Sequence, residues 1–96
     1  MNDTMTINES TTVKQNPNML TTPMDGEIVM MSIKHGKYYS IGKTGVAIWE
    51  EVGEGRTVQE IVSRLCERYE VDADVCKRDV IAFVEQMASK EIVLVR

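Results

Sequence analysis

Residues 34–49 read KHGKYYSIGKTGVAIW, and the order of turn, strand and helix signals in this stretch decides the fold. His35-Gly36 predicts a two-residue hairpin turn, because glycine supplies the positive φ that such a turn needs. The turn joins a strand over Glu27–Lys34 to a returning strand over Lys37–Ile41, both rich in β-branched or aromatic residues. A helix over Gly45–Val52 follows at once and carries the only tryptophan.

The predicted hairpin has two apolar faces. A two-residue turn would pair Ile33 with Tyr38 and Met30 with Ile41, and residues two apart on a strand share a face. One face would then carry Ile28, Met30, Tyr39 and Ile41. The other would carry Val29, Met31, Ile33 and Tyr38. A small hairpin needs apolar residues on both faces only if each face is covered, or if one is kept for a partner.

Three helices are predicted after the hairpin. Thr44 is the candidate N-cap of the first helix, which has a buried stripe through Trp49. The second begins with a capping box, Thr57-Val58-Gln59-Glu60, and runs to Tyr69. The third follows Asp72 or Asp74 and runs to about Ser89. Its core seam is expected to be Cys76, Val80, Phe83 and Met87, and a second apolar seam holds Ile81, Val84 and Ala88.

The segments at the two ends of the chain are less regular. Residues 1–10 are polar and are expected to form a disordered tail, which leaves one domain over residues 11–96. Thr11–Gln15 is a candidate edge strand. Met19–Pro23 is expected to pack loosely before a turn at Asp25-Gly26. Ile92–Val95 is expected to be a short strand or an extended apolar tail.

Composition excludes several classes of protein. A chain of 96 residues supports one small domain, with little room for an enclosed active site. The net charge of -4 and the scattered Lys and Arg argue against a general polyanion binder. The chain has no apolar run of transmembrane length, and residues 1–15 lack the apolar core of a signal peptide, so we do not expect secretion. Cys66 and Cys76 lack the partners of a disulfide framework or zinc site, so we expect buried thiols in a cytoplasmic protein.

No residue pattern predicts catalysis, a cofactor or a metal site. His35 is the only histidine, and no carboxylate or second ligand lies near it in the sequence. Gly42-Lys43-Thr44 lacks the upstream glycine spacing of a phosphate-binding loop. Glu50, Glu51 and Glu54 are expected to form a solvated run of charge.

Two features instead favour a peptide-binding surface. Strand Lys37–Ile41 is short, and at a sheet edge its backbone would be free to pair with an extended ligand. The second seam of the third helix, which includes Ile81 and Val84, would give an apolar wall beside it. The alternative is that this seam packs against Ile92–Val95.

Five motifs, in order, resemble the PqqD-like family. They are Gly36–Ile41, Gly45–Glu50, Thr57–Val62, Tyr69–Asp72 and Asp79–Val84, within a match that covers about residues 27–95. One departure is Ile41-Gly42, where the family more often has Leu-Asn. This change affects the start of the first helix and should not abolish the fold.

The resemblance implies an α+β, winged helix-turn-helix-like fold, with a three-stranded antiparallel sheet followed by three helices. It implies a non-catalytic recognition element without a cofactor, most similar to the free-standing leader-binding proteins of lasso peptide biosynthesis. Such a protein binds the leader of a ribosomal precursor peptide as an added strand and delivers it to a leader peptidase and a cyclase or other modifying enzyme. Carried over by position, the peptide-binding residues are Lys37, Tyr38, Tyr39, Ser40, Ile41, Lys77, Val80, Ile81 and Val84. We expect a monomer that binds neither nucleic acid nor membrane.

Two alternatives stay open. One is a DNA-binding winged helix, which has a small basic patch at Lys34, His35, Lys37 and Lys43. Its would-be recognition helix, Thr57 to Tyr69, carries Glu60 and Glu67 beside its arginines. The other is a non-catalytic subunit that binds a protein partner through an adaptable, methionine-rich surface.

Overall fold

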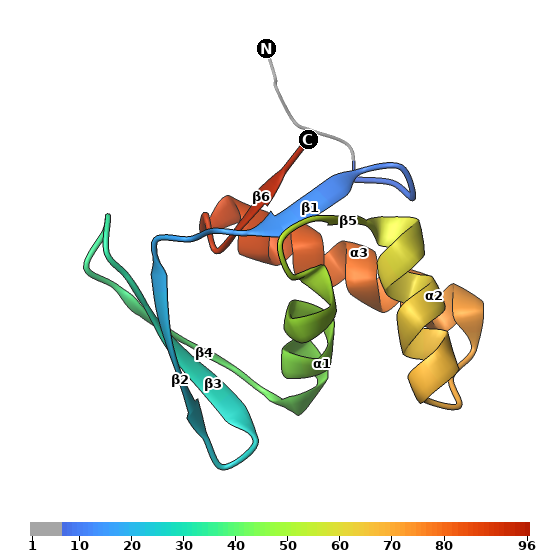
Figure 1. Cartoon of the computed structure of the whole chain (residues 1–96), viewed down its shortest axis with the longest axis horizontal. Coiled ribbons are helices and arrows are strands. Elements are labelled where there is room, and N and C mark those ends of the chain that lie inside the picture. Colours follow the sequence, from blue (N-terminus) through green and yellow to red (C-terminus); the bar gives the residue numbers. More distant parts are fainter. Residues whose placement is uncertain (1–6) are drawn as a thin grey trace.

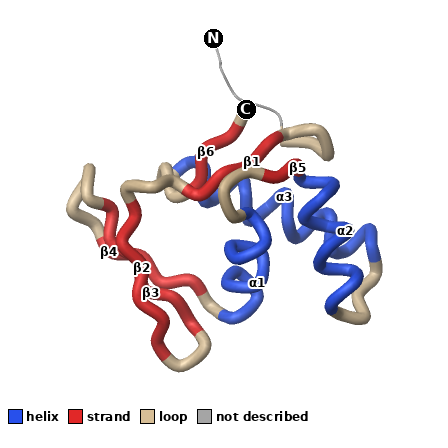
Figure 2. The backbone as a smooth tube through the Cα atoms, in the orientation of Figure 1, coloured by secondary structure: helices blue, strands red, loops and turns tan. Residues whose placement is uncertain are grey.

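The computed structural model describes residues 7–96, which form two small antiparallel sheets and three helices (Figure 1, Figure 2). The strands are β1 (Thr12–Gln15), β2 (Met19–Met24), β3 (Glu27–Ser32), β4 (Tyr38–Ile41), β5 (Arg56–Thr57) and β6 (Val93–Val95). The helices are α1 (Lys43–Val52), α2 (Val58–Arg68) and α3 (Ala73–Ser89). The predicted α+β class, with a three-stranded antiparallel sheet that leads into three helices, is confirmed.

The three strands of that sheet are not the three that were predicted. Its order is β2-β3-β4, so Met19–Pro23 belongs to a strand and does not pack loosely. Pro23 is tolerated there because β2 is an edge strand, where a missing N–H costs no ladder bond. The predicted edge strand Thr11–Gln15 is instead β1, the central strand of the second sheet, β5-β1-β6. Figure 1 shows the first sheet to one side of the helices and the second across their top.

The predicted register of the β3–β4 hairpin is wrong by two residues. The observed pairs are Met31 with Tyr38, in place of Ile33, and Met30 with Tyr39, in place of Ile41. The turn is longer than two residues, because the N–H of Ser32 donates to the carbonyl of Lys37 at 2.8 Å and closes a loop over the four residues between them. A shift of two preserves the faces. Met30 and Ile41 are therefore buried on the inner face, and Tyr38 is exposed on the outer one.

Helices α2 and α3 begin at side-chain N-caps, and α1 does not. At α2 the capping box is present: Thr57 Oγ1 accepts from the N–H of Glu60 at 3.1 Å, and Glu60 Oε1 accepts from the N–H of Thr57 at 2.8 Å. At α3 the cap is Asp72, whose carboxylate accepts two backbone N–H groups. The predicted Thr44 cap of α1 is wrong, since α1 begins at Lys43 with Gly42 at the N-cap and no side-chain cap bond.

One core lies between the helices and the inner faces of both sheets. Its fully buried side chains are Met30, Ile61, Ile92, Val13, Val52, Val58, Val80, Val84 and Val93. No helix within residues 7–96 combines the length and apolar character needed to cross a bilayer.

The described residues before β1 pack on the domain. Residues 1–6 of the expected disordered stretch lie outside the described residues. Ile7 is buried against the core, and Thr11 Oγ1 accepts the N–H of Asn8 at 2.9 Å. The described part therefore forms a turn that packs on the domain.

Candidate functional site

Strand β4 lies at the free edge of its sheet, as predicted, because it pairs only with β3. Ser32 and Lys37 form a hydrogen-bonded pair, and such pairs alternate along an antiparallel ladder. The backbone groups of Tyr39 and Ile41 therefore face β3. Those of Tyr38 and Ser40 face outward, and within residues 7–96 they bond to no other backbone group. An extended chain can pair with β4 through these two residues.

Helix α3 flanks this edge, and Gly45 at the start of α1 lets it approach. A Cβ on Gly45 would lie 2.5 Å from Ile41 Cγ2 and 3.0 Å from Phe83 Cε1. The first distance is too short for a real Cβ and the second is very tight, so the end of β4 and the middle of α3 both pack against the bare backbone of Gly45. We call the strip between β4 and α3, with a pocket at one end and a hollow at the other, the groove.

One stripe of α3 faces the groove. Asp79 and Phe83 are separated by four residues, which places them on one helical face at about 100° per residue. Phe83 packs at Gly45, and Lys90, the C-cap residue of α3, lines a hollow that also includes Tyr39 of β4. Asp79 lines a pocket beyond the other end of β4.

Three of the four helical residues predicted to bind a peptide, Lys77, Ile81 and Val84, lie outside this stripe. Val84 is fully buried in the core. Val80 is buried as well, but it belongs to the lining of the pocket beyond the end of β4. Lys77 and Ile81 lie on the side of α3 roughly opposite Phe83. There Lys77 Nζ is 2.6 Å from Glu9 Oε1, and Ile81 lines a hollow with residues 7–10. The segment before β1 thus covers the wall that was predicted. The contacts of residues 37–41 with a peptide stay a prediction.

The first end of the groove is an apolar pocket of about 400 Å³, here called the helix-end pocket. It lies between the start of α1, the end of α2 and α3. Its lining includes Ala47, Ile48, Leu65, Tyr69, Val71 and Val75, with Lys43 and Asp79 as its charged members. Sequence reasoning missed this pocket because three separate segments build it. The available signal was Val71 and Val75, two exposed apolar residues outside both predicted seams.

The second end of the groove is a polar hollow of about 450 Å³, here called the hairpin-end hollow. Its lining is His35, Lys37, Tyr39, Ser89, Lys90 and Glu91. His35 Nε2 lies 2.7 Å from Glu91 Oε1, so the histidine has a carboxylate partner that the sequence did not suggest. This contact holds the pKa of Glu91 below its ordinary value, and the charge of Lys34, 3.7 Å away, adds to the effect. The hairpin is thus tied to the end of α3.

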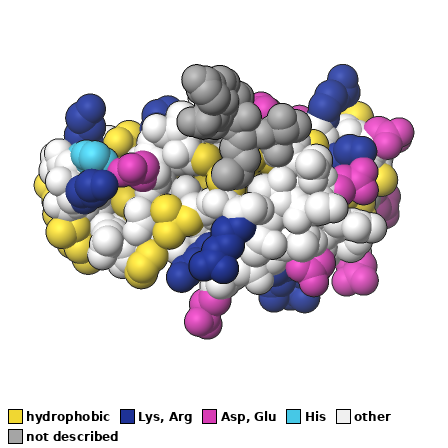
Figure 3. Space-filling model, turned by 90° about the horizontal axis from the view of Figure 1, so that it is seen from above, with side chains coloured by type: hydrophobic (Ala, Val, Ile, Leu, Met, Phe, Trp, Pro, Cys, Tyr) yellow, Lys and Arg dark blue, Asp and Glu magenta, His cyan; other side chains and the backbone are white. Residues whose placement is uncertain are grey.

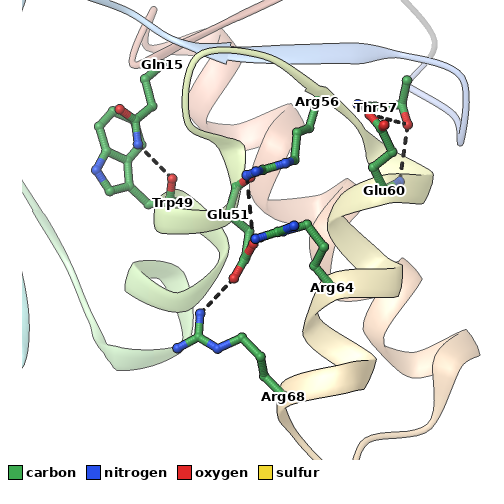
Figure 4. Close-up of polar contacts among 8 residues, drawn as sticks. All are labelled: Gln15, Trp49, Glu51, Arg56, Thr57, Glu60, Arg64 and Arg68. Carbon is green, nitrogen blue, oxygen red and sulfur yellow. Dashed lines mark hydrogen bonds and ion pairs between the residues drawn. The ribbon is translucent and has the colours of Figure 1, made fainter.

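Glu51 corrects the prediction of a solvated acidic run. Its side chain is buried between α1 and α2, and only its neighbours Glu50 and Glu54 are exposed. Its carboxylate accepts from Arg64 Nε at 2.6 Å and from Arg68 Nη1 at 2.7 Å (Figure 4). The bond from Arg64 is the main reason that the pKa of Glu51 lies below its ordinary value, although burial opposes it. The cluster lies outside the groove and holds two helices together.

Little in the described residues suggests reaction chemistry. Within residues 7–96 no three His, Cys, Asp or Glu side chains gather into a possible metal site. Cys76 is buried and Cys66 half-buried, and both are free thiols. Burial raises the pKa of Cys76, which keeps it in the unreactive protonated form. The groove offers backbone pairing and side-chain pockets.

Comparison with known proteins agrees with this geometry. The family described as coenzyme PQQ synthesis protein D (PqqD) matches residues 27–93. The chain belongs to the PqqD family. The resemblance read from the five motifs is therefore confirmed. No curated protein matches the chain.

Two solved structures are similar to this one. The first is TbiB1 in complex with the TbiA(beta) leader peptide, with 29% identity, a TM-score of 0.71, and coverage of 83% of this chain and 93% of the other. The second is lasso peptide synthetase B1 complexed with the leader peptide, with 19% identity and a TM-score of 0.70. That match covers 85% of this chain and 96% of the other.

Proposed function

We propose that this protein binds the leader segment of a ribosomally synthesised precursor peptide as a fourth strand beside β4. The observation that carries the proposal is the free edge of β4 with α3 beside it across Gly45. Both similar structures are complexes with a leader peptide, which supports the same role here.

The groove supplies affinity and specificity by separate means. The N–H and C=O groups of Tyr38 and Ser40 would form the ladder bonds, which any sequence can make. Alternate side chains of the leader would point toward α3. A bulky apolar one would fill the helix-end pocket, whose walls are already formed.

The reaction steps belong to partner enzymes in this proposal. A leader peptidase and a cyclase or other modifying enzyme would receive the precursor while its leader is held on β4. The protein would act as a monomer in the cytoplasm, where a ribosomal precursor is made. Its own role is to raise the local concentration of the substrate at the enzyme.

The contacts of Glu51 argue against the DNA-binding alternative. A recognition helix needs cationic side chains that are free to contact phosphates. Arg64 and Arg68 are the arginines of α2, and both are bound to the buried carboxylate of Glu51. Their charge is therefore partly neutralised by Glu51.

A proline substitution at the free edge tests the proposal. Ser40→Pro removes an N–H that faces away from β3, so the hairpin ladder keeps its bonds. We expect it to weaken binding of a synthetic leader peptide, encoded beside this protein's gene, by about tenfold, or ~1.4 kcal/mol. Ser40→Ala is the control and should bind normally. Fluorescence polarisation measures the affinity.

The site of binding is checked by amide NMR. Shifts on addition of the leader should concentrate at Tyr38–Ile41 and at the groove face of α3. Normal binding by a folded Ser40→Pro variant, or shifts confined to α2, would contradict strand addition.

A further inference from the structure

The hairpin-end hollow has an excess of positive charge. Its lining contains Lys37 and Lys90 against a single acid, Glu91, and Lys34 lies beside it. Figure 3 shows basic side chains on both sides of the histidine and an acidic one next to it. The whole protein has a net charge of -4, so this local excess runs against the overall balance.

The acid in the hollow is already engaged. Glu91 has its carboxylate at His35 and Lys34, and its backbone carbonyl accepts Asn16 Nδ2 at 2.7 Å. Glu91 also keeps a φ of 59°, a conformation that a non-glycine residue adopts only when its surroundings hold it. Within residues 7–96 neither Lys37 nor Lys90 forms an ion pair. The two lysines therefore face the hollow with their charge uncompensated.

We infer that this hollow binds an acidic side chain of the leader peptide, held by Lys37 and Lys90. The inference rests on the proposed function and adds a specificity to it. A leader strand beside β4 must pass the hollow, because Lys37 precedes β4 directly and Tyr39 belongs to it. A carboxylate there would pair with two cations that otherwise repel each other.

The structure also sets where this residue falls in the leader. The sheet is antiparallel throughout, so a leader added in the same sense runs opposite to β4. Its earlier residues then lie near the helix-end pocket and its later ones near the hairpin-end hollow. β4 spans four residues, and an extended chain advances about 3.3 Å per residue. The acidic residue should therefore follow the apolar anchor by about four positions or more.

Charge reversal tests the inference. The probe is the labelled synthetic leader peptide encoded beside this protein's gene, in its natural form and with the acidic residue changed to its amide. Lys90→Glu should weaken binding of the natural peptide by about fivefold, and the amide peptide should bind the unchanged protein about as weakly. Arg78→Glu, an exposed reversal on the same helix, is the matched control and should leave the affinity unchanged.

A swapped pair excludes a general electrostatic effect. A peptide with lysine in place of the acidic residue should bind Lys90→Glu better than it binds the unchanged protein. The inference is overturned if Lys90→Glu and Arg78→Glu behave alike, or if no acidic residue of the leader matters. Normal binding of every peptide would overturn the inference and leave the proposed function intact. Failure of the unchanged protein to bind the natural leader would overturn both.

Discussion

Both sheets of this protein have three strands, but they differ in how much of each is covered by the rest of the protein. In β5-β1-β6 the central strand carries Val13, which is fully buried, and α3 packs against β6. In β2-β3-β4 only the inner face is covered, at Met30 and Ile41. Its outer face exposes Leu20, Met24, Ile33 and Tyr38, and its last strand has a free edge. The β5-β1-β6 sheet stabilises the fold, and the β2-β3-β4 sheet keeps its hydrogen-bonding capacity for a ligand.

The largest expected effect is that of a charged substitution in the core. Val84→Glu should unfold the domain, because an unpaired charge in the core costs several kcal/mol, comparable with the total stability of a small domain. Circular dichroism with thermal unfolding measures this. Ala82→Glu, two residues away and exposed, should unfold within a few degrees of the unchanged protein. If Val84→Glu stays folded and loses only leader binding, Val84 belongs to the peptide-binding wall that the sequence predicted on α3.

A smaller loss of stability is expected at the buried carboxylate. Glu51→Gln should lower the free energy of unfolding by about 2 kcal/mol, because it weakens the bonds to Arg64 and Arg68 while leader affinity is unchanged. Glu50→Gln is the exposed control. Chemical denaturation gives the free energies. Equal effects of the two substitutions would mean that the cluster contributes nothing.

Acid should have a matching effect on stability. The pKa of Glu51 in the folded protein is below its ordinary value of 4.5, so the unfolded state binds the proton more readily. The stability that Glu51 contributes is therefore complete above 4.5 and declines as the pH falls through that value toward the folded pKa. The decline should be shallower in Glu51→Gln. Parallel pH profiles of the two proteins would exclude Glu51 as the cause.

Local signals in the sequence predicted local structure well. The capping box at Thr57 was correct because its two bonds join residues three apart. The faces of the hairpin were correct even though the turn length was wrong, since a slip of two residues preserves them. The free edge of β4 was also correct, and the family resemblance pointed to the same strand.

Contacts between distant segments were not predictable in the same way. Glu51 finds its arginines 13 and 17 residues away, and His35 finds Glu91 across 56 residues. Most of the wall predicted on α3 lies outside the stripe that faces the groove, because the helix has two apolar seams. Periodicity shows that both seams are apolar, but it cannot show that residues 7–10 cover Ile81 and leave Phe83 toward the groove.

A substitution at Gly45 tests the junction between the two halves of the groove. Gly45→Ala would force Ile41 and Phe83 apart, at an overpacking cost of about 1–3 kcal/mol. We expect weaker leader binding as well, because β4 and α3 move relative to each other. Gly42→Ala, with no atom within 4 Å of the new Cβ, is the control for both readouts. A Gly45→Ala variant with normal stability and affinity would show that the junction is not tight.

The smallest effect is expected on the outer face of the same sheet. The side chain of Tyr38 is 72% exposed, whereas its backbone groups face the free edge. Tyr38→Ser should change the free energy of unfolding by less than about 1 kcal/mol, the scale of a cross-strand contact with Met31. Leader affinity should change less than in Ser40→Pro, because serine keeps the backbone N–H that proline removes. A loss of affinity equal to that of Ser40→Pro would assign recognition to the Tyr38 ring, and the exposed face of the sheet would then contact the leader directly.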